Sequence, residues 1–303
     1  MVRPASFGYN PETAVTNSFQ QLPSASSGGT EAALARKEHE GLAVALASEG
    51  LNVCLVADTP EPVKPDAVFP NNWVSFHEDG TVVLYPMQAQ SRRRERRQEV
   101  VDAVAARLGF KVTRTLDLTS HEAHGRYLEG TGSLVLDHIE RAAYACLSPR
   151  TDPTVVTEWC RELEYEPVLF SAVDRAGTPI YHTNVLLCIG EKLAVIGTEA
   201  IVPADRARVI ERLRGTGREV IEIGHAEIER FAGNMLELGS WDEALGDCRV
   251  LVMSETARHA LSADAFARLS AYTDQVLSVP VPTIERLGGG SVRCMLAEVF
   301  LPS

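Results

Sequence analysis

Among the six cysteines of this chain, Cys294 stands in a setting that suits a nucleophile. Three glycines, Gly288–Gly290, come just before it, and glycine allows positive φ and close approach of the backbone to a ligand. Arg293 precedes the thiol directly, and a nearby cation favours the thiolate. The other five cysteines occur in apolar runs, which is typical of inert buried thiols. We therefore expect Cys294 to carry out nucleophilic chemistry.

A cysteine nucleophile needs a general acid/base, and a histidine in that role needs a carboxylate that fixes its tautomer. His182 lies just before the apolar run Val185–Ile189, so we expect its side chain to project from a strand end. Glu129 ends a short apolar run and opens a glycine turn at Gly130. Both have an ordinary alternative, since a lone histidine is usually structural and a carboxylate in a turn usually lies on the surface. The remaining histidines from His77 onward stand in polar surroundings and are predicted at the surface.

Amides and arginines supply further polar candidates. The segment from Asp66 through Phe69 ends in two successive asparagines, Asn71 and Asn72. Each amide offers both donors and an acceptor, so the pair suits the wall of a polar pocket, although Asn-Asn is otherwise a turn signal. The basic run Arg92–Arg97 is, on its own, most simply a solvated helix face.

Composition excludes several classes of function. The net charge of −12 argues against nucleic acid or an anionic membrane as partner. No cysteines pair as C-x-x-C, no apolar run approaches the length of a membrane span, and Met1–Gln20 has no apolar signal region. We expect a cytoplasmic enzyme with reduced thiols, no metal and a small-molecule partner; a homo-oligomer is compatible with the sequence. Only the patch Ser24–Gly29 has the composition of a disordered segment.

The elements that must position these residues alternate between helices and strands. Five helices are predicted, each followed by a strand and separated from the next by further short strands such as 81–84, 133–136 and 142–146. Their predicted ranges are 30–48, 92–108, 153–164, 203–215 and 263–272, followed by strands at 51–57, 111–115, 168–173, 219–223 and 275–279. Such spacing indicates a repeat of a few strands and one helix. Two tandem Rossmann domains would alternate similarly, but no G-x-G-x-x-G follows a strand and no P-loop motif occurs.

Four segments, in this order, resemble the guanidine-modifying or pentein superfamily, which includes arginine deiminases, dimethylarginine dimethylaminohydrolases and amidinotransferases. They are Asp66–Asn72, Leu128–Gly130, His182–Asn184 and Gly288–Cys294, and together they span nearly the whole chain. Ser91–Glu95 is similar to the S-R-R-x-E run of the dimethylarginine hydrolases. The resemblance implies an α/β fold, a five-fold pseudo-symmetric propeller of ββαβ modules. It also implies one catalytic domain over residues 1–303 and no cofactor.

Carried over by position, the resemblance makes Cys294 the nucleophile, His182 the acid/base and Glu129 its orienting carboxylate. It also implies that Arg92 or Arg93 holds the α-carboxylate of the substrate, as a bidentate guanidinium can.

The departures from the family pattern bear on the substrate. Arginine deiminases grip the guanidinium with two aspartates, and those positions here hold Asn72 and Asn184. Amides do not neutralise a cation but suit a neutral ureido group, which has both an acceptor and donors. The aspartate of the family's E-G-G-D is also lost, because Glu129 is followed by Gly-Thr-Gly-Ser.

The N-terminal region, including Asn10–Thr13 and Asn17–Gln20, is similar to the bacterial citrulline-utilisation branch, which makes Asn17 a further candidate contact. We therefore expect hydrolysis of citrulline to ornithine, ammonia and carbon dioxide through an S-carbamoyl enzyme. The alternatives are an arginine dihydrolase, deiminase or methylarginine hydrolase, and a non-catalytic amino-acid-binding pentein.

Overall fold

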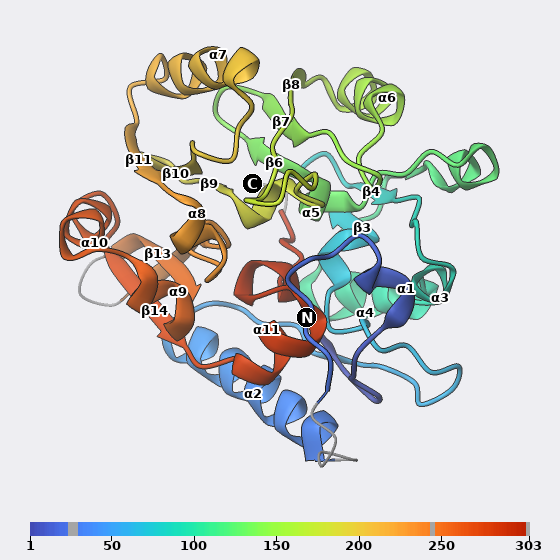
Figure 1. Cartoon of the computed structure of the whole chain (residues 1–303). Helices are drawn as coiled ribbons and strands as arrows, with labels where there is room; N and C mark the ends of the chain where they lie inside the picture. Colours follow the sequence, from blue (N-terminus) through green and yellow to red (C-terminus); the bar gives the residue numbers. More distant parts are fainter. Residues whose placement is uncertain (24–29, 243–245, 301–303) are drawn as a thin grey trace.

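Four three-stranded sheets of identical plan are arranged around a common axis in the computed structural model, which describes residues 1–23, 30–242 and 246–300 (Figure 1). In each sheet the first strand pairs antiparallel with the second, and the second pairs parallel with the third. The strands are β3 (Val74–Phe76), β4 (Thr81–Leu84) and β5 (Arg114–Asp117); β6 (Leu134–Asp137), β7 (Ala142–Cys146) and β8 (Glu166–Phe170); β9 (Leu187–Ile189), β10 (Leu193–Gly197) and β11 (Glu219–Ile223); and β12 (Leu236–Asp242), β13 (Gly246–Ser254) and β14 (Gln275–Val279). The predicted disordered patch, Ser24–Gly29, lies outside the described residues.

A helical crossover joins the second and third strand of each sheet, because two parallel neighbours cannot be joined by a tight turn. The crossovers contain α4 (Gln98–Leu108), α6 (Pro153–Leu163), α7 (Pro203–Arg214), and the pair α9 (Glu255–Ala260) and α10 (Ala263–Ser270). The predicted start of α6 is confirmed: Asp152 accepts from the Thr154 and Val155 amides, and Pro153 occupies the first turn.

The fifth module is divided between the two ends of the chain. The N-terminal part supplies β1 (Val2–Arg3), α2 (Thr30–Ser48) and β2 (Val56–Ala57), with β1 and β2 parallel. From the C-terminal part, Val299 forms a bridge with Phe76 of β3. The four three-stranded sheets thus follow the ββαβ plan, the two-stranded sheet occupies the fifth position, and the predicted pentein propeller is confirmed.

One predicted helix is wrong at its start. The range 92–108 contains the end of a short helix, α3 (Gln90–Arg93), and then α4, with an extended residue, Arg97, between them. Arg92 and Glu95, which the sequence predicts on a solvated helix face, instead point inward and bond each other. Several short elements have no counterpart among the predicted ones. They are the helices α1 (Pro11–Ala14), α5 (Gly130–Ser133), α8 (His225–Ile228) and α11 (Pro282–Gly288), and the 3₁₀ turns η1 (Pro70–Asn72), η2 (Thr119–His124), η3 (Thr183–Val185) and η4 (Val292–Met295).

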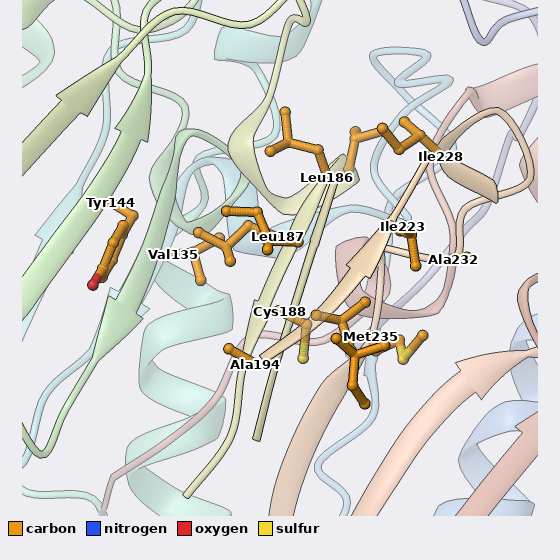
Figure 2. Packing of buried hydrophobic residues seen from close by; sticks show 14 of the residues in the cluster. Val135, Tyr144, Leu186, Leu187, Cys188, Ala194, Ile223, Ile228, Ala232 and Met235 are labelled. Carbon is orange, nitrogen blue, oxygen red and sulfur yellow. The ribbon is translucent and has the colours of Figure 1, made fainter. Parts of the chain in front are cut away.

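Apolar side chains fill the space between neighbouring sheets. Figure 2 shows Val135 of β6 and Leu187 of β9 close together in the largest cluster. Every residue of β7 is buried, because its sheet is covered on both faces. The prediction that the other five cysteines are buried is confirmed. The prediction of a surface position is wrong for His77, which is buried and bonds to Ser75.

No helix within the described ranges has the length and apolar character required to cross a bilayer.

Candidate active site

Five turns meet at one end of the propeller axis. Four of them come just before β3, β6, β9 and β12, the first strand of each three-stranded sheet, here called the inner strands. Asn72 closes η1 before β3, Gly132 lies in α5 before β6, and Asn184 lies in η3 before β9. Asn234 directly precedes Met235 and β12, and Cys294 lies in η4. The turn α5 contacts both η1 and η3, and η1 contacts η4. The propeller therefore gathers polar residues that are far apart in the sequence.

His182 and Glu129 form a buried pair. Nε2 of His182 lies 3.0 Å from Oε2 of Glu129. The same oxygen accepts from Nη1 of Arg150 at 3.4 Å, and Oε1 accepts from the amide of Gln88 at 3.1 Å. Burial opposes the charge of Glu129, but Arg150 and His182 outweigh it and hold the pKa of this carboxyl well below its usual range. Glu129 is thus a permanent carboxylate.

Burial lowers the pKa of His182 to about 4, although Glu129 acts in the opposite direction. His182 is therefore neutral near pH 7, with Nε2–H donated to Glu129 and the lone pair on Nδ1. That nitrogen faces Gly132, where an added Cβ would lie 2.7 Å from His182 Nδ1 and 2.5 Å from Asn72 Nδ2. Gly132 leaves the space in front of both groups open.

Cys294 lies in the same pocket as His182 and is 3% exposed. Its sulfur is 3.3 Å from Nδ2 of Asn234 and 3.6 Å from Nδ2 of Asn184. Burial raises the pKa of this thiol, so the resting cysteine is protonated. A reaction at Cys294 must therefore begin with loss of this proton.

Arg293 lowers the pKa of the Cys294 thiol in the expected direction, but it does so without touching the sulfur. Its guanidinium donates to the carbonyl of Leu296 at 2.9 Å and to Glu298 at 3.2 Å, and it lines a different cavity. Arg293 and Cys294 are consecutive in the tight turn η4, and their side chains point into different cavities. Arg293 therefore acts on the thiol only through its charge. That charge is weaker than the effect of burial.

The glycine loop before Cys294 is packed too closely for side chains. A Cβ on Gly288 would lie 2.7 Å from the ring of Phe69, and one on Gly289, at φ +62°, would lie 2.6 Å from Nδ2 of Asn17. Asn17 itself donates to the carbonyls of Gly288 and Gly289 and accepts from the Phe19 amide. Asn17 therefore holds the loop, and its side-chain polar atoms are already engaged.

Arg92 fixes the orientation of the Asn72 amide. Nη1 of Arg92 donates to Oδ1 of Asn72 at 2.7 Å, while Nε and Nη2 bond the two oxygens of Glu95. A guanidinium has only donors, so the amide must turn its oxygen to Arg92. Nδ2 of Asn72 is consequently the group directed toward Gly132, and it has no partner among the described residues.

Asp66 also presents an unpaired atom. Its Oδ2 accepts from Asn10 at 2.7 Å and from Thr13 at 3.3 Å, whereas Oδ1 is buried without a partner in the described part of the chain. Burial raises the pKa of this carboxyl, and Arg92 opposes that effect. Asp66 lines the pocket that contains Cys294.

The structure brings most of the predicted site residues together. The pocket is lined by Asn17, Asp66, Phe69, Asn72, Arg92, His182 and Cys294. Glu129 and Asn184 lie directly behind it, bonded to His182 and near the thiol. Two further predicted residues also lie outside the lining: Arg93 bonds the carbonyl of Met87, and Asn71 is buried with both polar side-chain atoms unpaired among the described residues.

Arg150 and Asn234 belong to the site but were not predicted from the sequence. Arg150 lines the pocket, donates to Thr13 and Thr16, and lies 5.0 Å from the ring centroid of Tyr181. It occurs in a turn with no visible motif. The sequence does contain a signal for Asn234. The tripeptide Asn234–Met235–Leu236 matches Cys294–Met295–Leu296 in its last two residues, which places Asn234 in a position equivalent to the nucleophile. Groups of side chains able to hold a metal ion are not found in the described ranges.

Comparisons with known proteins agree with this architecture. A family model described as N,N dimethylarginine dimethylhydrolase, eukaryotic, matches residues 3–301. No curated protein matches the chain. The chain is similar in fold to ArgZ, an arginine dihydrolase of the ornithine–ammonia cycle in cyanobacteria, with a TM-score of 0.73 and 19% identity. That alignment covers 100% of this chain and 40% of ArgZ, so the chain spans about 40% of the length of that relative.

Two further structures match over nearly their whole length. The N-terminal domain of ArgZ, bound to substrate, has a TM-score of 0.69 and 19% identity, covering 99% of this chain and 98% of that domain. A dimethylarginine dimethylaminohydrolase adduct with S-methyl-L-thiocitrulline has a TM-score of 0.63 and 18% identity, covering 97% and 96%.

Proposed function

The chain belongs to the N,N dimethylarginine dimethylhydrolase family of penteins, and from that premise we propose that it hydrolyses the ureido group of citrulline. The family acts on carbon–nitrogen bonds of guanidino compounds, so the finer question is which terminal group this site accepts. The products would be ornithine, ammonia and carbon dioxide. No metal or organic cofactor takes part in the proposed reaction.

The orientation of Asn72 carries this proposal. Its oxygen is held by Arg92, and its NH2 group faces the space between Gly132 and His182. A ureido carbonyl is an acceptor and can receive that N–H. A guanidinium carries only donors and would meet another donor there. An aspartate at this position would favour the cation, and its absence favours the neutral substrate.

The reaction begins with transfer of the Cys294 proton to Nδ1 of neutral His182. The thiolate attacks the ureido carbon, and His182 returns the proton to the δ-nitrogen as the bond to ornithine breaks. Water, activated by the neutral His182, then adds to the S-carbamoyl group and releases Cys294. The carbamate product decomposes to ammonia and carbon dioxide. Glu129 holds the histidine tautomer and stabilises its transient charge.

The amino-acid end of the substrate is assigned to Arg92, Arg150 and Asp66. Nη1 of Arg92 donates one of its two hydrogens to Asn72 and lies 3.9 Å from Oε2 of Glu129, and Nη1 of Arg150 donates one hydrogen to the same oxygen. The second hydrogen of each Nη1 makes no hydrogen bond within the described residues. Two guanidinium groups can share one α-carboxylate in this way, whereas Arg93 lies outside the pocket. The unpaired Oδ1 of Asp66 suits the α-ammonium group.

An arginine dihydrolase is the second candidate, because the similar ArgZ structure carries that activity and Asp66 adds a buried carboxyl to the pocket. The test incubates the purified protein separately with citrulline, arginine and dimethylarginine and measures ornithine and ammonia. Acid-quenched enzyme is then weighed intact, and the mass gain at Cys294 is assigned to a carbamoyl or an amidino group.

Ornithine from citrulline, with a carbamoyl adduct, is the expected result. Consumption of arginine with citrulline left untouched would overturn the choice of substrate. A Cys294→Ser protein with undiminished turnover would instead support a non-catalytic role for the thiol.

A further inference from the structure

Asn234 belongs to the ring of turn residues that surrounds the thiol. Like Asn72, Gly132 and Asn184, it stands just before an inner strand, and its side chain is fully buried. Cys294 holds the corresponding place in the fifth module. The pseudo-symmetry of the propeller therefore directs Asn234 toward the same point on the axis as the nucleophile.

The turn that carries Asn234 is built to hold it there. Its amide donates to the carbonyl of Phe231 at 2.8 Å, and Phe231 adopts a left-handed conformation at φ 61°. A Cβ on Gly233 would lie 2.4 Å from the carbonyl oxygen of Val185, so this turn packs directly on the η3 segment. The backbone position of Asn234 is thus set by close packing and not by the thiol.

The side chain of Asn234 has a defined orientation. Nδ2 donates to the carbonyl oxygen of Asn184 at 2.9 Å and lies 3.3 Å from Sγ of Cys294. The two hydrogens of one NH2 group account for both contacts. Because the backbone carbonyl of Asn184 accepts only from a donor, it fixes which end of the amide is the NH2 group, and that group is closer to the sulfur than Oδ1, which lies 3.7 Å away.

Cations near the sulfur are engaged elsewhere. Arg293 bonds Leu296 and Glu298, and Arg150 bonds Glu129. Among the described residues, the side chains that hydrogen-bond Sγ are Asn184 and Asn234. The Asn184 contact is longer, at 3.6 Å, and its Nδ2 also donates to Thr131. A buried thiolate needs donors, and Asn234 offers the shorter one.

We propose that Asn234 is a catalytic residue, whose Nδ2–H donates to the Cys294 sulfur while that sulfur carries negative charge. The bond strengthens when the thiolate forms to attack the substrate and again when water expels it from the covalent intermediate. The inference rests on the proposed function only in taking Cys294 as the nucleophile, because it is independent of which substrate the pocket accepts.

The test measures the pH dependence of Cys294 alkylation by iodoacetamide, followed by peptide mass spectrometry, with Cys294→Ser as blank. Asn234→Leu keeps the approximate shape of the side chain and removes the donor. We expect its titration midpoint to rise by about one pH unit, with alkylation about tenfold slower below the midpoint. Asn52→Leu, an exposed change of the same kind, is the matched control and should titrate as wild type.

A correctly folded Asn234→Leu protein with the wild-type midpoint would overturn the inference, since a purely structural asparagine would leave thiol titration unchanged. Thermal unfolding checks the fold. A second measurement needs no change at Asn234: the side-chain amide resonance of Asn234 is followed by NMR as pH is raised. It should shift with the Cys294 midpoint in wild type and stay constant in Cys294→Ser. A constant resonance in both would also refute the inference. Neither measurement uses a substrate, so failure of the citrulline proposal would be seen separately.

Discussion

The two ends of the propeller axis differ in both size and polarity. At the starts of the inner strands, the pocket beside Cys294 has a volume of about 10 Å³, about the space of one water molecule. At the other ends of these strands a cavity of about 680 Å³ opens, lined largely by aliphatic side chains. Consecutive residues, Arg293 and Cys294, line the wide cavity and the narrow pocket respectively.

Charges at the wide end satisfy one another. Asp137 receives two bonds from Arg218, at 2.6 and 2.8 Å, and Glu191 pairs with Arg249 at 2.7 Å. Oε1 of Glu237 is an exception, being buried without a partner among the described residues. At the narrow end Asp66 and Asn72 both present unpaired atoms beside a nucleophile and a base. The active site is therefore identified by unpaired polar groups beside reactive side chains, and not by the volume of the cavity.

The largest expected effect distinguishes two buried cysteines, one at each end. Cys294→Ser should lower ornithine release at least about a thousandfold, because a hydroxyl is a far poorer nucleophile at neutral pH. Cys188→Ser, in the wall of the wide cavity, should cost about 1–3 kcal/mol of stability by burying a hydroxyl. Turnover per folded Cys188→Ser molecule should equal wild type. Equal loss in both variants would contradict the assignment of the narrow end.

A second pair of variants compares a base with a carboxylate. His182→Asn should reduce kcat about a hundred- to ten-thousandfold, since it removes the proton acceptor. Glu237→Gln at the wide end should leave kcat and KM unchanged, although its carboxyl also has an unpaired oxygen. Steady-state kinetics on both proteins provide the measurement. A large loss in Glu237→Gln would show that the wide cavity takes part in the reaction.

A third pair of variants compares two neighbouring arginines near the narrow pocket, Arg92 inside it and Arg93 outside it. Arg92→Lys should lower kcat/KM about ten- to a hundredfold, because an ammonium cannot bond Glu95, Asn72 and Phe69 together. Arg93→Lys should stay within about twofold of wild type, because Arg93 lies outside the pocket. Kinetics with citrulline test both, and the reverse order of effects would restore Arg93 as the substrate arginine.

A final prediction compares the acid stability conferred by two buried histidines. Burial lowers the pKa of both His77 and His182 to about 4. Above about pH 6.5 both residues are neutral in the folded and unfolded states. As pH falls from there to about 4, the unfolded chain binds protons that the folded one does not. Each histidine then removes about 3 kcal/mol of stability.

Changing either His77 or His182 to Asn should therefore flatten the loss of stability between these pH values. Urea unfolding at about pH 7 and pH 4.5 measures it. An unchanged pH dependence in both variants would show that the two histidines do not titrate as described.

The sequence by itself determined the nucleophile candidate, its acid/base partner and the modular plan. Local rules sufficed for these, because the glycines before Cys294, the cap at Asp152 and the helix spacing are properties of short segments. The substitution of Asn72 and Asn184 for aspartates was likewise visible in the sequence alone.

Only the tertiary structure decided which neighbouring residue faces the site. Arg92 and Arg93 have the same side chain and follow each other in α3, but successive helical residues point about 100° apart, so only Arg92 is buried in the pocket. Arg293 turns away from the thiol beside it, whereas Asn234, sixty residues away, contacts it. These contacts depend on how five turns meet at the axis. Separation along the chain carries no information about that geometry, because closure of the propeller sets it.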